Sequence, residues 1–147
     1  MKNLLLSCLF SFVLLSVDLL FGHCQVPCGI YADQHRFEQM LEDQTTIEKA
    51  TKLIQELSGK KDAQSQNQLI RWISTKESHA DSIQKIIAQY FMTQRLKSAD
   101  PKYVDKLTKA HSVMVLAMKC KQTADLKNTA DLKSAIMNFH KSYESKK

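Results

Sequence analysis

The residues with the richest chemistry lie close together near the N-terminus, in residues 23–31, HCQVPCGIY. If a mature chain began at His23, its α-amine, its imidazole and the backbone amide of Cys24 would offer three nitrogen donors. Cys24 and Cys28 would add two thiolates. The proline and the glycine within the stretch favour a turn, so all of these donors can converge on one ion.

This donor set indicates which metal would bind. Structural zinc prefers four Cys or His side chains, usually from two well-separated pairs, whereas this stretch has a single Cys-x3-Cys spacing. An amine, a deprotonated amide and two thiolates instead suit square-planar nickel(II) or copper(II). An axial imidazole and electron-rich donors would stabilise nickel(III), which makes a nickel(III)/(II) cycle possible. The alternative is a Cys24–Cys28 disulfide in an oxidising compartment.

The residues before this stretch have the pattern of a secretory signal peptide. A basic start, Met1–Asn3, precedes the apolar run Leu4–Val17 and the short exit segment Asp18–Gly22. The apolar run is too short for a comfortable membrane span, and a retained anchor is the alternative. We expect residues 1–22 to be a cleaved leader and residues 23–147 to be the mature domain. That domain would be secreted or extracytoplasmic, with no stable membrane anchor after cleavage.

The rest of the chain has the composition of a small helical domain. Among 147 residues there are only three Gly and two Pro, which argues against a turn-rich β-sandwich or barrel. Four cysteines are too few for a disulfide-dense mini-protein. The formal net charge is +6, but the lysines are spread along the chain without a concentrated basic run. We therefore expect no nucleic-acid partner.

After a short non-helical segment that ends at Ala32, apolar residues recur at helical spacing. They form four stripes, which span Phe37–Leu57, Leu69–Phe91, Tyr103–Met118 and Leu126–Tyr143. Short polar loops between them predict an all-α fold, an antiparallel up-down four-helix bundle with an N-terminal metal-binding hook at residues 23–31. A second helix over Gln64–Leu96 would be about 45–50 Å long, so it would project beyond its neighbours or break.

The third helix has two notable sequence features. Asp100 and Pro101 predict its N-cap and its first helical residue. Its apolar surface is wider than one bundle face requires, because a stripe of Tyr103, Val104, Leu107, Met114, Val115 and Met118 is accompanied by Val113, Leu116 and Ala117. This width indicates either a contact between subunits or a deeply buried helix.

The stretch HCQVPCGIY closely resembles the N-terminal nickel hook, HCxxPCGxY, of the nickel superoxide dismutase family. The RWISTKESHA stretch and the Tyr90-Phe91 pair also resemble that family's second helix. The resemblance implies a four-helix bundle assembled as a homohexamer, with a nickel ion as cofactor. It implies an antioxidant enzyme that disproportionates superoxide to dioxygen and hydrogen peroxide through a nickel(III)/nickel(II) cycle. The positive net charge is consistent with attraction of a small anion.

The resemblance also implies roles for residues of the hook. His23 would bind nickel through its α-amine and its axial imidazole, and Cys24 through its amide nitrogen and thiolate. Cys28 would bind through its thiolate. Tyr31 would lie by the open axial face and position superoxide or water without binding the metal.

Two residues outside the hook match positions that support the axial histidine in the family. Glu38 matches the acidic residue that orients it, and the segment before Glu38 is one residue shorter here. His79 stands where bacterial members have an arginine. Two further departures are Gln25 in place of an Asp, and Ala32-Asp33 in place of Asp-Pro.

The remaining histidines and the last cysteine have no ligand-like spacing. We expect His35, His111 and His140 to be surface or core residues, and Cys120 to be a buried small residue. The competing function is that of a secreted four-helix interaction protein with a disulfide in the hook, or a metal-binding protein without turnover. The N-terminal residue of the mature chain discriminates between these, because a blocked or extended His23 has no amine donor.

Overall fold

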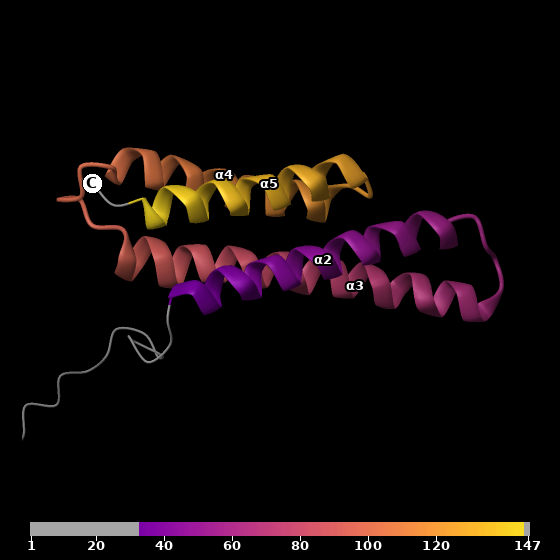
Figure 1. Cartoon of the computed structure of the whole chain (residues 1–147). Coiled ribbons are helices and arrows are strands. Elements are labelled where there is room, and N and C mark those ends of the chain that lie inside the picture. The colour runs from indigo at the N-terminus through magenta and orange to yellow at the C-terminus, as the bar shows by residue number, and fades with distance from the viewer. Residues whose placement is uncertain (1–32, 146–147) are drawn as a thin grey trace, which may run out of the picture.

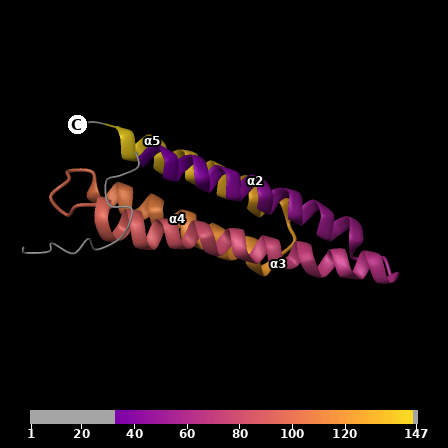
Figure 2. The same cartoon turned by 90° about the horizontal axis from the view of Figure 1, so that it is seen from below.

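The computed structural model describes residues 33–145, which fold as an antiparallel bundle of four long helices (Figure 1). The elements are α2 (Asp33–Leu57), α3 (Ala63–Lys85) continued by the π-helix η1 (Ile86–Arg95), α4 (Tyr103–Gln122) and α5 (Leu126–Glu144). Each helix packs on the next along the chain, and α2 also packs on α5, which closes the bundle (Figure 2). The predicted all-α four-helix bundle is confirmed, while the hook lies outside the described residues. Within residues 33–145, no helix has both the length and the apolarity needed to cross a membrane.

The predicted apolar stripe of α2 forms one wall of the core. Phe37, Met40, Ile47 and Ala50 are each at most 1% exposed. They recur at helical spacing, so they share the face that turns towards α3 and α5. Gln44 lies on the same face and donates a hydrogen bond of 3.0 Å from Nε2 to the Thr129 carbonyl in α5. This bond satisfies a buried amide and ties two helices together.

The hairpin of α2 and α3 extends past the end of the α4–α5 hairpin (Figure 1). This confirms the expected projection of the second helix. In the projecting part, apolar side chains of α3 stay in solvent: Ile70 is 64% exposed and Ile73 is 42% exposed. The stripe becomes buried from Ala80 onward, where the other hairpin covers it.

The second helix changes its winding instead of breaking. From Ile86 to Arg95 it is a π-helix that follows α3 directly. The backbone N–H of Leu96 donates to the carbonyl of Phe91, five residues back, at 2.9 Å. Side chains five positions apart would lie about 140° apart around an α-helix, whereas the wider π-helical turn brings them closer to the same side.

The predicted start of α4 is wrong by two residues. The helix begins at Tyr103, with Lys102 as its N-cap residue, and Asp100 and Pro101 lie in the preceding turn. The Asp100 carboxylate accepts a hydrogen bond from the Lys102 N–H at 2.8 Å and forms an ion pair with Lys106 Nζ at 2.7 Å. The backbone here closes a tight turn, in which the Tyr103 N–H donates to the Asp100 carbonyl at 2.9 Å, and regular α-helical winding follows it.

The predicted stripe of α4 is only partly correct. Tyr103, Leu107 and Met114 pack against the core, but Val104 is 73% exposed and Met118 is 41% exposed. The fully buried apolar residues of the helix are Ala110, Val113, Ala117 and Cys120. Apolar residues lie on most sides of this helix, so periodicity alone could not select the inner face. Small residues occupy that face because α4 packs closely on its neighbours. In α5, Ala130 is likewise exposed, and Leu132 takes the predicted core role.

A cluster of aromatic rings fills the core near the start of α2. Phe37 packs on Phe91 with ring centroids 4.7 Å apart and on Phe139 with centroids 5.3 Å apart. Tyr143 lies beside them, 5.2 Å from Phe91 between centroids. Such tilted and edge-to-face pairs are favourable beyond the area they bury. They bring α2, η1 and α5 together at one end of the bundle.

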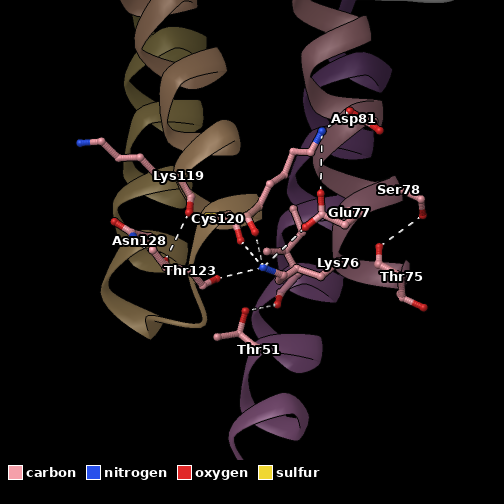
Figure 3. A network of polar contacts seen from close by, with 12 residues as sticks. Thr51, Thr75, Lys76, Glu77, Ser78, Asp81, Lys119, Cys120, Thr123 and Asn128 are labelled. Atoms are coloured by element: carbon pink, nitrogen blue, oxygen red, sulfur yellow. Dashed lines mark hydrogen bonds and ion pairs between the residues drawn. The ribbon is translucent and has the colours of Figure 1, made fainter. Parts of the chain in front are cut away.

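A buried lysine of α3 caps the C-terminal end of α4 (Figure 3). Lys76 of α3 is 4% exposed, and its Nζ donates hydrogen bonds to the carbonyls of Cys120, Lys121 and Thr123 at 2.6, 2.8 and 2.9 Å. The last carbonyls of a helix have no partner within the helix, and a cation is stabilised at that end. Lys76 therefore satisfies these acceptors and joins α3 to α4.

Replacement of this ammonium group tests its contribution to stability. We expect Lys76→Met, which keeps the chain length but removes the donor, to lower the free energy of unfolding by about 2–4 kcal/mol. Urea unfolding followed by circular dichroism measures the change. Lys52→Met, in the exposed Lys52–Glu48 pair of α2, is the control and should cost less than about 1 kcal/mol. Equal effects of the two substitutions would contradict the capping role.

Candidate metal centre

The predicted hook residues His23, Cys24, Cys28 and Tyr31 lie outside the described residues. Within residues 33–145, no three or more His, Cys, Asp or Glu side chains gather closely enough to hold a metal ion. The described chain starts at Asp33, at the first turn of α2. The groups around Asp33 are therefore the part of the bundle nearest along the chain to the hook.

The Asp33 carboxylate is shared by three donors. Its Oδ1 accepts hydrogen bonds from the Tyr90 hydroxyl at 2.5 Å and from Arg95 Nε at 2.7 Å. Its Oδ2 accepts a hydrogen bond of 2.7 Å from the Tyr143 hydroxyl. We refer to these four residues as the Asp33 cluster. Because they come from α2, η1 and α5, the cluster joins three elements at one end of the bundle.

These contacts decide the charge of the cluster. Partial burial by itself would raise the pKa of Asp33, but the hydrogen bonds from Tyr143, Tyr90 and Arg95 outweigh it and lower the pKa. Burial, followed by the bond to Asp33, raises the pKa of both Tyr90 and Tyr143. The carboxylate thus stays ionised and both phenols stay protonated at neutral pH, which keeps all three donors in place.

Tyr90, which belongs to the aromatic pair that resembles the family, has two cations close to its ring. The guanidinium groups of Arg36 and Arg95 lie 5.2 and 5.3 Å from its ring centroid, and the residue is 5% exposed. Cations at this distance are attracted by the aromatic face. Arg36 and Tyr90 also line a cavity of about 340 Å³ together with Lys85, so its wall carries positive charge.

The structure places Glu38 and His79 with different partners. Glu38 is exposed on α2 and accepts a hydrogen bond of 2.9 Å from Gln34 Nε2. His79 of α3 has its Nδ1 2.6 Å from Oδ1 of Asp43, which is 7% exposed. A carboxylate at this distance orients an imidazole ring. The roles of Glu38 and His79 towards His23 stay predictions, because the hook lies outside the described residues.

The other histidines and Cys120 are placed as expected. His35 and His111 are exposed. The ring of His140 stacks on Phe37 with centroids 4.1 Å apart, and its Nε2 lies 3.0 Å from Glu144. Cys120 is 1% exposed, and burial raises the pKa of its thiol to about 11. Since the thiolate is the reactive form, this cysteine is chemically inert near neutral pH.

Sequence reasoning missed Asp33, Arg95 and Tyr143 as a group, and it missed Asp43 as the partner of His79. Asp33 carried a weak signal, since an acidic residue is favoured in the first turn of a helix. No signal pointed to its partners, which lie 57, 62 and 110 residues further along the chain. The π-helical winding that brings Tyr90 and Arg95 to one carboxylate was not visible in the apolar pattern either.

The lowered pKa of Asp33 predicts a pH-dependent contribution to stability. Its contribution is fully present above the unfolded pKa of about 3.9 and is lost as the pH falls through the lower folded value. We expect Asp33→Asn to cost about 1–2 kcal/mol near neutral pH, after allowance for solvent screening. The difference from the unsubstituted protein should shrink below about pH 4. Urea unfolding at several pH values measures it.

Asp131→Asn is the matched control, because Asp131 forms an exposed pair with Lys127 in α5. It should change stability by less than about 1 kcal/mol at every pH. A difference for Asp33→Asn that stayed constant down to strongly acidic pH would contradict an ionised, hydrogen-bonded carboxylate.

Comparison with known proteins adds one match. A family model described as nickel-containing superoxide dismutase matches residues 20–147, which include residues 23–31 and all of the described bundle. No curated protein and no solved structure matches the chain significantly. The family implies nickel as cofactor and superoxide as substrate. The chain therefore belongs to the nickel-containing superoxide dismutase family, whose members are nickel-dependent oxidoreductases.

Proposed function

We propose that the mature protein begins at His23 and binds nickel through His23, Cys24 and Cys28. The observation that carries this proposal is the HCQVPCGIY stretch, which lies within the family match and directly before α2. The reaction converts two superoxide anions and two protons into one dioxygen and one hydrogen peroxide. Nickel, when bound, would supply the redox chemistry by alternating between its (III) and (II) states.

The chemistry of the donors fits this ion. Cys24 and Cys28 would supply two thiolates, and two backbone nitrogens would complete a donor set that suits nickel(II). The free amine exists only if the bond between Gly22 and His23 is cut. Cys120 does not compete for the metal, because its thiol is buried and its pKa is raised to about 11. The hook thus holds the thiols available for coordination after cleavage.

Residues around the ligands would orient the substrate or the imidazole of His23, and they would not bind the metal. We propose that Tyr31 would position superoxide or water beside the metal without binding the ion. Glu38 and His79 would support the imidazole of His23, and the 2.6 Å contact with Asp43 would hold the ring of His79 in a defined orientation. Outer partners of this kind typically affect affinity or activity by about 10–100-fold.

Positive charge on the bundle supports attraction of an anionic substrate. The net charge is +6, and Arg36 and Lys85 line the cavity beside Tyr90. Fields of this sign raise the encounter rate of a small anion, and salt screens them.

We also propose secretion and self-association. Residues 1–19, which hold most of the signal-like segment, lie outside the family match, in line with a leader removed before residues 23–147 act in an extracytoplasmic compartment. Assembly as a homohexamer is proposed from the family resemblance.

Substitution of the cysteines tests the ligand set. Cys24→Ser and Cys28→Ser should each lower nickel content or superoxide consumption by at least about 100-fold, because a hydroxyl is a poor donor for this ion. Metal analysis and pulse radiolysis measure the two quantities. Cys120→Ser is the matched control and should stay within about twofold of the unsubstituted protein. The reverse ranking would place the reactive thiol in α4 and contradict the proposal.

Substitution of His23 separates its two donors. In a correctly cut His23→Ala chain the α-amine remains, so nickel should still bind at near-normal stoichiometry. Loss of the imidazole should weaken the nickel(III) electron spin resonance signal and lower the dismutation rate by about 10–100-fold. Intact mass spectrometry must first show that the chain begins at residue 23. Wild-type turnover, or complete loss of nickel, would contradict the axial role of the imidazole.

A further inference from the structure

We propose that Asp33 is a positioning residue for the metal centre: its three-way contact with Tyr90, Arg95 and Tyr143 sets where the hook leaves the bundle. This inference rests on the proposed function of the hook. It concerns residues of the described bundle, none of which is a predicted ligand of the metal.

The length of the chain makes the position of Asp33 matter. In the sequence, Tyr31 lies two residues before Asp33 and Cys28 lies five residues before it. Each residue of an extended chain spans at most about 3.6 Å, so the connecting backbone is short. Any displacement of the start of α2 is therefore transmitted to the hook over a short stretch of backbone.

Asp33 makes more side-chain hydrogen bonds to other elements than an aspartate at the start of a helix usually makes. A first-turn aspartate usually faces its own helix N-terminus and the surrounding solvent. Here the side chain accepts hydrogen bonds from η1 and from α5. The two phenol bonds lie on different oxygens of the carboxylate, so they restrain both its location and its rotation. First turns of helices otherwise fray readily, and these bonds oppose fraying at the point where the hook begins.

The π-helix is what allows two of these contacts. Tyr90 and Arg95 are five positions apart, so an α-helix would direct them about 140° away from each other. In η1 both reach Oδ1 of Asp33, and the Arg95 guanidinium lies 5.3 Å from the Tyr90 ring centroid. π-Helical turns are rare and frequently occur at functional sites. The winding of η1 therefore fixes Tyr90 and the start of α2 relative to one another.

The test compares two variants of the cluster with a matched control. Asp33→Asn keeps the shape of the side chain and removes its charge, and Tyr143→Phe removes one hydrogen bond and keeps the ring. Asp81→Asn is the control, because Asp81 forms an ion pair of 2.7 Å with Lys121 that joins α3 to α4. All three are prepared as the full-length mature chain, with the N-terminus verified by mass spectrometry and folding verified by circular dichroism.

Three properties are measured below the unfolding temperature of each variant. They are nickel affinity in competition with a chelator, the line shape of the nickel(III) spin resonance signal, and the rate of superoxide consumption. We expect both cluster variants to bind nickel about tenfold more weakly and to give a broadened signal, because the ligands sample more than one arrangement. Superoxide consumption by nickel-loaded protein should fall about tenfold, and Asp81→Asn should match the unsubstituted protein in all three.

Two results would overturn the inference. One is a cluster variant with unchanged nickel affinity and an unchanged line shape, even if it were less stable, since the cluster would then serve stability alone. The other is an equal change in Asp81→Asn, which would show that any loosening between helices has the same effect. Failure of the proposed function is distinguishable, because in that case the unsubstituted protein itself would neither bind nickel nor consume superoxide.

Discussion

The end of the bundle at which α2 begins depends on the contacts of the Asp33 carboxylate. The carboxylate accepts hydrogen bonds from Tyr90 and Tyr143 and forms an ion pair with Arg95. These donors come from η1 and α5, which are far from Asp33 in the sequence. A partly buried carboxylate is costly unless its oxygens are satisfied. The three donors meet that cost, and in doing so they bring α2, η1 and α5 into one arrangement.

The C-terminal end of α4 is held by a positive charge, the ammonium group of Lys76. Lys76 donates to three carbonyls at the end of α4, and its position between α3 and the turn before α5 is seen in Figure 3. The two ends are therefore joined by one partly buried anion and one buried cation, while most of the core between them is apolar. In our proposal the Asp33 end supports the metal centre, and the Lys76 end stabilises the fold.

The cations near Tyr90 connect the fold to the chemistry of a dismutase. Both arginines contact the ring of Tyr90, but only Arg95 is paired with Asp33. Arg36 donates a hydrogen bond to the neutral side chain of Gln39. Its charge is thus available to an approaching anion. Superoxide is small and singly charged, so a dismutase gains more from a local field and an exact placement of its ligands than from a shaped binding pocket.

The sequence by itself determined the family, the helical class and the candidate ligands, because these depend on local chemistry: the spacing of donors in HCQVPCGIY and the helical periodicity of apolar residues. Only the tertiary structure decided which face of α4 is buried, since Val104 and Ala110 are both apolar and packing alone separates them. It also decided the partners of Asp33 and of His79. The packing of the helices and the π-helical winding of η1 bring those partners together. A pattern of residue types along the chain shows neither the packing nor the winding.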